Sequence, residues 1–82
     1  MVVVQQLRSA RAVLRWSIQD LSSASTVSVR TIKTIEARDG PPQCRPGTVK
    51  KLVSAFESAG IDFIGTPEDR PGIRIRHPGQ RT

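Results

Sequence analysis

The sequence predicts a mainly α fold, in which four helices are followed by a short C-terminal β-hairpin. Over residues 1–60, apolar side chains recur at steps of three and four residues, the spacing of one helix face. Over residues 61–76, apolar and polar residues alternate, as in a half-buried strand. We therefore expect one helical domain at 1–60, a hairpin at 61–76 and a disordered tail at 77–82.

Apolar spacing and a capping pattern predict the first two helices. The first helix has an apolar face of Val4, Leu7, Ala10 and Leu14, with Arg8, Arg11 and Arg15 on its other side. Ser17 offers a side-chain oxygen to the start of the next helix, and Asp20 completes a capping-box-like pattern. A second helix is expected from about Ile18 to Ser25.

The third helix follows after only two connecting residues. Ser28 repeats the capping signal, and Ile32 and Ile35 are spaced to face inward. The third helix is therefore expected over residues 28–37.

A loop and a strongly amphipathic segment predict the fourth helix. Two consecutive prolines prevent helix continuation, so residues 39–47 are expected to form a loop and Thr48 to cap the next helix. Gly60 supplies the left-handed residue that ends this helix. Its apolar positions are Val49, Leu52, Val53 and Phe56.

The alternating segments near the C-terminus predict a two-stranded hairpin. Residues 65–72, which include Pro67 and Pro71, separate the two strands. An isolated hairpin is marginally stable, so this one needs the helical core or a second copy of itself. Four apolar side chains form a surface larger than the helices need, and they are the expected dimer contact: Ile61, Phe63, Ile73 and Ile75.

The charge of the chain favours a polyanionic partner. Thirteen Lys and Arg against seven Asp and Glu give a net charge of +6, and the pI is about 11.1. Nucleic acid is the first candidate and an anionic membrane the second. The aromatic residues are Trp16, Phe56 and Phe63, all in apolar patterns that indicate core packing. This disfavours RNA recognition by base stacking.

Other classes of protein lack the residues they need. The longest apolar run, Met1 to Val4, is far shorter than the roughly 20 residues of a membrane span, so we expect a cytoplasmic protein without membrane contact. A single cysteine, Cys44, allows no internal disulfide, and with His77 alone it cannot build a zinc site. Because no phosphate loop or catalytic set is present, we expect neither an enzyme nor a cofactor.

The second and third predicted helices carry the functional hypothesis. Two short helices joined by a tight turn are typical of the motif that inserts its second helix into the major groove of DNA. We expect Arg30 and Lys33 to read guanine, and Val29 to pack on a thymine methyl group. The outward residues of the third helix, all expected to contact bases, are Ser28, Val29, Arg30, Lys33 and Thr34.

Residues 7–60 resemble the XRE/Cro-like helix-turn-helix regulators of bacteria and their phages. The resemblance is carried by L-x-x-A-R-x-x-L-x-W-S-x-x-x-L from Leu7 to Leu21 and by V-S-x-x-T-I-x-x-I-E from Val27 to Glu36. It implies a lambda-repressor-like fold and a structural ion pair between Arg11 and Glu36. It also implies phosphate contacts at the start of the second helix, made by Ser17 and Gln19.

The sequence departs from this family at three positions. Thr26 replaces the common turn glycine and is strained if the backbone needs a positive φ. Ile18 replaces the glutamine that often opens the second helix. Arg38 replaces a glycine, and we expect it and Arg45 to contact the DNA backbone from a longer loop.

These expectations give one leading function and one rival. The leading hypothesis is a homodimeric transcriptional regulator, without a small-molecule cofactor, that binds a palindromic operator in double-stranded DNA and represses by occlusion or activates by touching polymerase. The rival is a protein-interaction module, such as an antiactivator or antitoxin, built on the same scaffold. Basic residues on the third helix favour the first.

Overall fold

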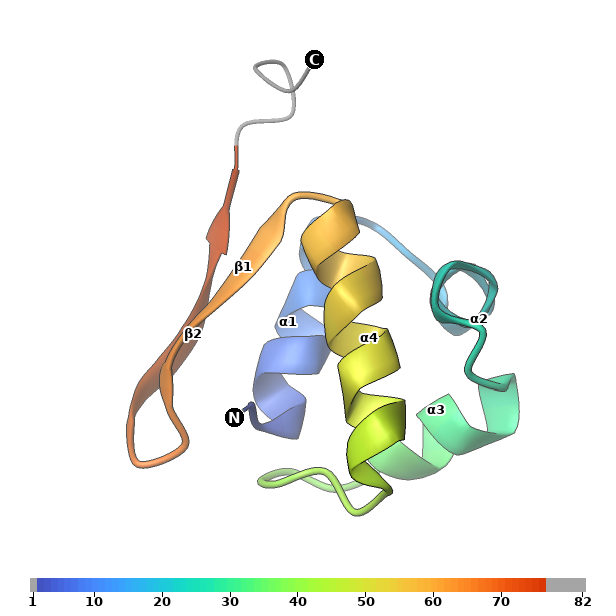
Figure 1. Ribbon diagram of the computed structural model, residues 1–82, viewed down its shortest axis with the longest axis horizontal. Helices are drawn as coiled ribbons and strands as arrows, with labels where there is room; N and C mark the ends of the chain where they lie inside the picture. Colours follow the sequence, from blue (N-terminus) through green and yellow to red (C-terminus); the bar gives the residue numbers. More distant parts are fainter. Residues whose placement is uncertain (1, 77–82) are drawn as a thin grey trace.

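Four helices and a two-stranded antiparallel hairpin make up the computed structural model, which describes residues 2–76 (Figure 1). The mainly helical fold with a terminal hairpin is therefore confirmed. The expected disordered tail at 77–82, with His77, lies outside the described residues. The elements are α1 Val4–Val13, α2 Ile18–Ser25, α3 Val29–Glu36, α4 Pro46–Ser58, β1 Ile61–Thr66 and β2 Asp69–Ile75.

Side-chain caps begin α2 and α3 where the sequence places them. The Asp20 amide donates to Ser17 Oγ at 3.0 Å, and the Ser17 amide donates to Asp20 Oδ2 at 2.9 Å, so the capping box is complete. At α3, the Thr31 amide donates to Ser28 Oγ at 3.1 Å. Each cap satisfies amides that have no partner within the helix.

The turn between α2 and α3 is tight and strained. Thr26 adopts a left-handed conformation with φ 65°, which a β-branched residue rarely occupies and which costs about 1–3 kcal/mol. Buried Ser25 holds the turn, because its hydroxyl donates to the Leu21 carbonyl at 2.7 Å and accepts from the Val27 amide at 3.2 Å. The expected strain at Thr26 is confirmed.

The start of α4 corrects one expectation. The helix begins at Pro46, with Arg45 as its N-cap, and not after a cap at Thr48. Proline suits the first helical position because its missing amide would have no helical partner there and its φ is already helical. The inward face of α4 is as expected, with Leu52 and Phe56 buried. Gly60 ends the helix with φ 100°.

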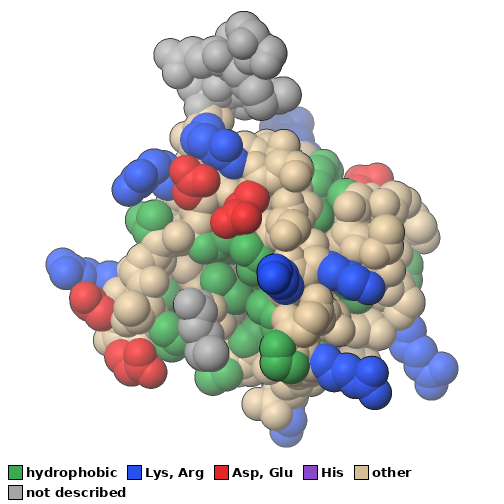
Figure 2. Space-filling model, viewed as in Figure 1, with side chains coloured by type: hydrophobic (Ala, Val, Ile, Leu, Met, Phe, Trp, Pro, Cys, Tyr) green, Lys and Arg blue, Asp and Glu red, His purple; other side chains and the backbone are tan. Residues whose placement is uncertain are grey.

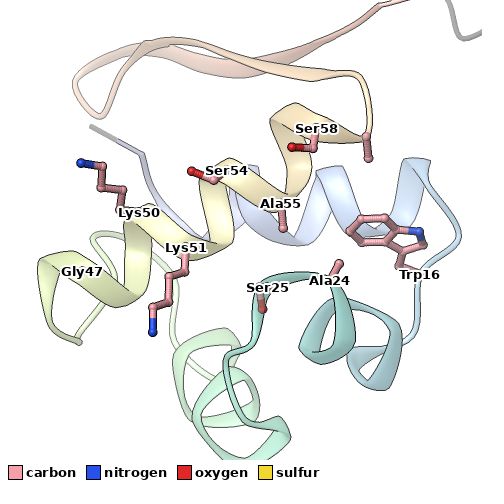
Figure 3. A pocket seen from close by; sticks show the side chains of 10 residues that line it. Trp16, Ala24, Ser25, Gly47, Lys50, Lys51, Ser54, Ala55 and Ser58 are labelled. Atoms are coloured by element: carbon pink, nitrogen blue, oxygen red, sulfur yellow. The ribbon is translucent and has the colours of Figure 1, made fainter.

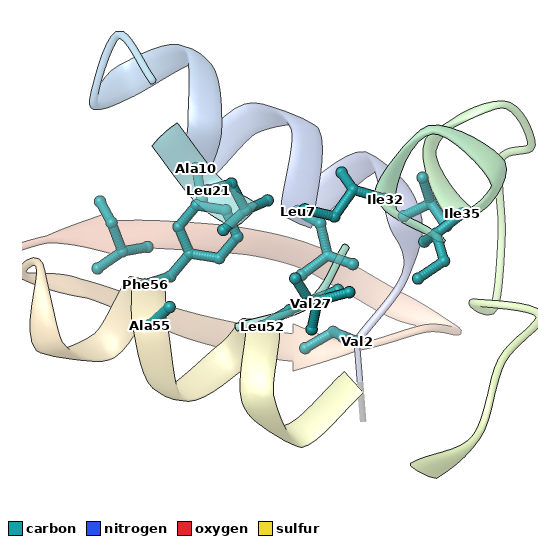
Figure 4. Close-up of a cluster of buried hydrophobic side chains, with 12 residues drawn as sticks. Val2, Leu7, Ala10, Leu21, Val27, Ile32, Ile35, Leu52, Ala55 and Phe56 are labelled. Atoms are coloured by element: carbon teal, nitrogen blue, oxygen red, sulfur yellow. The ribbon is translucent and has the colours of Figure 1, made fainter. Parts of the chain in front are cut away.

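The core lies between the four helices and the hairpin. Leu7 from α1, Ile32 from α3 and Leu52 from α4 are each 1 % exposed, and Figure 4 shows them in one cluster. Phe56 stacks on Trp16 with ring centroids 5.6 Å apart and meets Phe63 edge to face at 5.9 Å. The core role expected for the three aromatic rings is confirmed.

The hairpin packs on the helices of its own chain. In its register Ile61 faces Ile75 and Phe63 faces Ile73, and the sheet contacts both α1 and α4 (Figure 1). Ile61 is completely buried, and Phe63 and Ile73 pack against the core. The expectation that all four form a free apolar surface is therefore wrong, since only Ile75, at 54 % exposure, is open to solvent.

Buried Gln6 fastens the hairpin to α1. Its amide nitrogen donates to the Ile64 carbonyl at 3.0 Å and to the Gly72 carbonyl at 2.8 Å, one in each strand. Its amide oxygen accepts from the Val3 amide at 2.8 Å. The side chain is thus fully hydrogen-bonded at only 3 % exposure of the residue, and it fixes the hairpin in place.

Candidate nucleic-acid interface

Helix α3 presents a polar and basic face to solvent. Ile32 and Ile35 are 1 % and 3 % exposed, so their side of the helix is occupied by the core. Of the five expected base-contacting residues, Val29 is half-buried and the other four are exposed. The division between inward and outward positions is therefore as predicted except at Val29, which is partly covered, and all five residues lie in one short stretch of chain.

The exposed side chains of α3 differ in the hydrogen bonds they already make. Ser28 donates to Thr31 Oγ1 at 2.9 Å while it caps the helix. Thr34 donates to the Arg30 carbonyl at 3.0 Å. Both hydroxyl protons are thus used within the helix. Arg30 and Lys33 form no salt bridge with the described residues, so they are the charged donors that α3 offers to a ligand.

A partly buried ion pair between Arg11 and Glu36 holds α3 against α1. Arg11 Nε and Nη2 donate to the two Glu36 carboxylate oxygens at 2.9 and 2.8 Å, and Nη1 donates to the Trp16 carbonyl at 2.9 Å. The hydrogen bonds to Glu36 raise the pKa of Arg11 above its ordinary value, and desolvation opposes them more weakly. The predicted ion pair is confirmed as a structural contact.

A second arginine of α1 neutralises the negative charge of Asp39 in the loop after α3. Arg8 forms a salt bridge with Asp39 and donates from Nη1 to the Glu36 carbonyl at 2.9 Å. Arg8 and Arg11 together pair with both carboxylates between residues 30 and 51, Glu36 and Asp39. Both arginine side chains are therefore already paired with acidic residues of the same chain.

The cations of the same segment face solvent without such partners. Six exposed Lys and Arg side chains lie between residues 30 and 51, and none forms a salt bridge with a described acidic residue. Figure 2 shows basic side chains without acidic ones at its lower right, where α3 lies in Figure 1. We call these six the basic segment: Arg30, Lys33, Arg38, Arg45, Lys50 and Lys51.

The expected phosphate contacts occupy two places in the chain. Arg38 and Arg45 lie in the loop between α3 and α4, and both are exposed. Ser17 and Gln19 are exposed at the start of α2. There the Asp20 carboxylate already accepts the Ser17 amide at 2.9 Å, so a negative side chain shares the helix start with the expected phosphate. From the sequence, only a capping role was predicted for Asp20, and its negative charge beside the expected phosphate contact was missed.

Residues 2–76 contain neither a metal-binding cluster nor a membrane-spanning helix. No group of three or more His, Cys, Asp or Glu side chains in this part of the chain is placed to hold a metal ion. Cys44 is half-buried, and burial raises the pKa of its thiol above the ordinary value. No helix within these residues is long and apolar enough to cross a bilayer.

Comparison with known proteins identifies no family for the chain. No protein-family model matches its sequence, and no significant match among curated proteins is found.

Proposed function

We propose that the protein is a sequence-specific, double-stranded DNA-binding transcriptional regulator of the helix-turn-helix class. In this proposal α2 and α3, joined by the turn at residues 26–28, form the motif, and α3 enters the major groove. The resemblance of residues 7–60 to XRE/Cro-like regulators supports the assignment, as do two short helices joined by a tight turn.

The observation that carries the proposal is the separation of charge around α3. The two acidic residues between residues 30 and 51, Glu36 and Asp39, are paired with Arg11 and Arg8 from α1, while the six cations of the basic segment remain free and exposed. Such an arrangement gives a locally positive surface, which a polyanion neutralises with release of its counterions.

The outward side chains at α3 have proposed roles that follow from their chemistry and from the hydrogen bonds they already make. Arg30 and Lys33 donate to O6 and N7 of guanine, and Val29 packs on a thymine methyl group. Ser28 and Thr34 accept from base amino groups, since their protons are held within the helix. Arg38 and Arg45 bind phosphates, as do Ser17 and Gln19 in a weaker role beside the Asp20 carboxylate.

The proposal includes a homodimer on a palindromic operator. Two copies of α3 would enter successive major grooves about 34 Å apart. Among the four hairpin residues first expected to form the dimer contact, Ile75 has the exposed surface for it, and Ile64 on the same hairpin is 37 % exposed. The dimer would repress by covering a promoter or activate by touching polymerase.

A binding selection tests this function. The protein is mixed with a randomised duplex pool, and the bound fraction is sequenced for wild type, Arg30→Ala and Lys33→Ala. We expect an enriched palindrome, with binding weakened by about 1–3 kcal/mol for each variant and base preference relaxed. Arg74→Ala is the matched control, because Arg74 is an exposed arginine on the hairpin. Uniform, salt-sensitive binding without an enriched sequence would refute sequence-specific regulation.

A further inference from the structure

A groove of about 720 Å³ runs between α2 and α4, and of the basic segment only Lys50 and Lys51 line it (Figure 3). No residue of α3 lines it. Small side chains, including buried Ser25 and Ala55, form its inner surface. Trp16 lies at one end, and Lys50 and Lys51 lie toward the other (Figure 3).

The two ends of the groove differ in chemistry. Trp16 is half-buried and adds aromatic carbon, with Ala24 and Ala59 lining the groove as well. Lys50 and Lys51 are exposed, and neither forms a salt bridge with a described acidic residue. A ligand that fits both ends has an apolar surface along most of the groove and a negative charge at the end beside the two lysines.

We propose that this groove docks an acidic amphipathic helix of a partner protein. The lining residues of α4 and its C-cap extend from Gly47 to Ala59, a length of roughly 18 Å at 1.5 Å per residue, which is about three helical turns. Small side chains let a partner helix approach closely, and its apolar face lies along the groove as in other helix-in-groove complexes. Its carboxylates meet the two lysines.

A protein helix fits this groove better than a nucleic-acid strand. A strand carries a charge at every nucleotide and needs cations along its whole path, whereas the lysines here lie toward one end (Figure 3). Base stacking needs an open aromatic face, but Trp16 is stacked on Phe56 at 5.6 Å. The inference does not depend on DNA binding by α3.

Trp16 provides a direct measurement, because it is the only tryptophan in the chain. The probe is a synthetic amphipathic helical peptide of about 14 residues, matched to the groove length, with leucines on one face and glutamates near one end. The comparison peptide carries lysine in place of each glutamate. We expect saturable change in Trp16 emission with the acidic peptide and none with the basic one.

Matched variants separate docking from general charge attraction. Lys50→Gln with Lys51→Gln should weaken binding of the acidic peptide about two- to thirtyfold, as expected for two exposed ion pairs. Arg70→Gln with Arg74→Gln removes the same charge from the hairpin and should leave binding unchanged. Ser54→Arg adds positive charge but fills the groove, so it should weaken docking, whereas charge attraction alone would strengthen it. Circular dichroism checks that each variant is folded.

Several results would overturn the proposal. Equal binding of the two peptides, or equal loss in both double variants, would show that the groove has no preference for an acidic helix. If the lysine variant instead loses DNA affinity as strongly as Arg30→Ala and wild type ignores the acidic peptide, the lysines belong to the DNA surface. Because the peptide assay contains no DNA, failure of the regulator hypothesis would leave its result intact.

Discussion

Arg11→Ala should strongly destabilise the fold, because Arg11 joins α1 to α3. Its guanidinium donates two hydrogen bonds to Glu36 and a third to the Trp16 carbonyl. The side chain of Glu36 is only 9 % exposed, and that of Arg11 is 24 % exposed. Removal of the arginine would leave a poorly hydrated carboxylate without a counter-charge.

The expected loss follows from this burial. Breaking a fully buried ion pair costs about 3–5 kcal/mol, and partial exposure of Arg11 lowers the expected loss to about 2–3 kcal/mol. A domain of this length has a free energy of unfolding of about 4–12 kcal/mol. The melting temperature should therefore fall by about 10–20 °C.

Urea and thermal unfolding followed by circular dichroism measure this loss. Arg15→Ala is the control, because Arg15 is exposed near the end of the same helix and forms no salt bridge with the described residues. It should change stability by less than about 0.5 kcal/mol. Replacing both Arg11 and Glu36 by leucine should recover much of the loss, since no charge is then left buried. A loss below about 1 kcal/mol in Arg11→Ala would refute the reasoning.

Two further predictions concern the hairpin and the start of α2. Phe63→Glu should unfold the monomer, because the Phe63 ring packs on Phe56 with centroids 5.9 Å apart. Ile75→Glu should leave the fold intact and produce monomers in sedimentation. A folded Ile75→Glu variant that is still dimeric would rule out Ile75 as a dimer contact. Asp20→Asn should increase DNA affinity about two- to threefold at low salt by removing a negative charge beside the proposed phosphate contact. Its melting temperature should fall only slightly, since asparagine still accepts the Ser17 amide, and unchanged affinity would exclude a phosphate there.

Local interactions explain why most helix boundaries could be predicted. The caps at Ser17 and Ser28 each join residues three positions apart, so both residues of each capping hydrogen bond lie close together in the sequence. The start of α4 was predicted wrongly, because Pro46 and Thr48 are both suitable starts and lie only two residues apart. Nothing in the local sequence decides between a proline start and a threonine cap.

Long-range polar contacts explain what sequence reasoning missed. Gln6 lies 58 and 66 residues from the strands it binds, and its position on α1 gave no sign that the hairpin would need a buried donor. The hairpin's apolar side chains were assigned to a dimer because their partner surface on α1 and α4 is visible only after folding. The outward face of α3 was predictable, since helical periodicity alone separates it from Ile32 and Ile35.

The positive surface around α3 depends on the fold more than on net charge. From the sequence, Arg8 and Arg11 contribute to the basic character of the chain as much as Arg30 does. In the folded protein they pair with Asp39 and Glu36. Their positive charges therefore neutralise the two negative charges of residues 30–51, the part of the chain that contains α3. Because both arginines of α1 are paired in this way, the six cations of residues 30–51 have no acidic partner among the described residues. The contacts that fix the position of α3 are therefore the same ones that leave its surface positive.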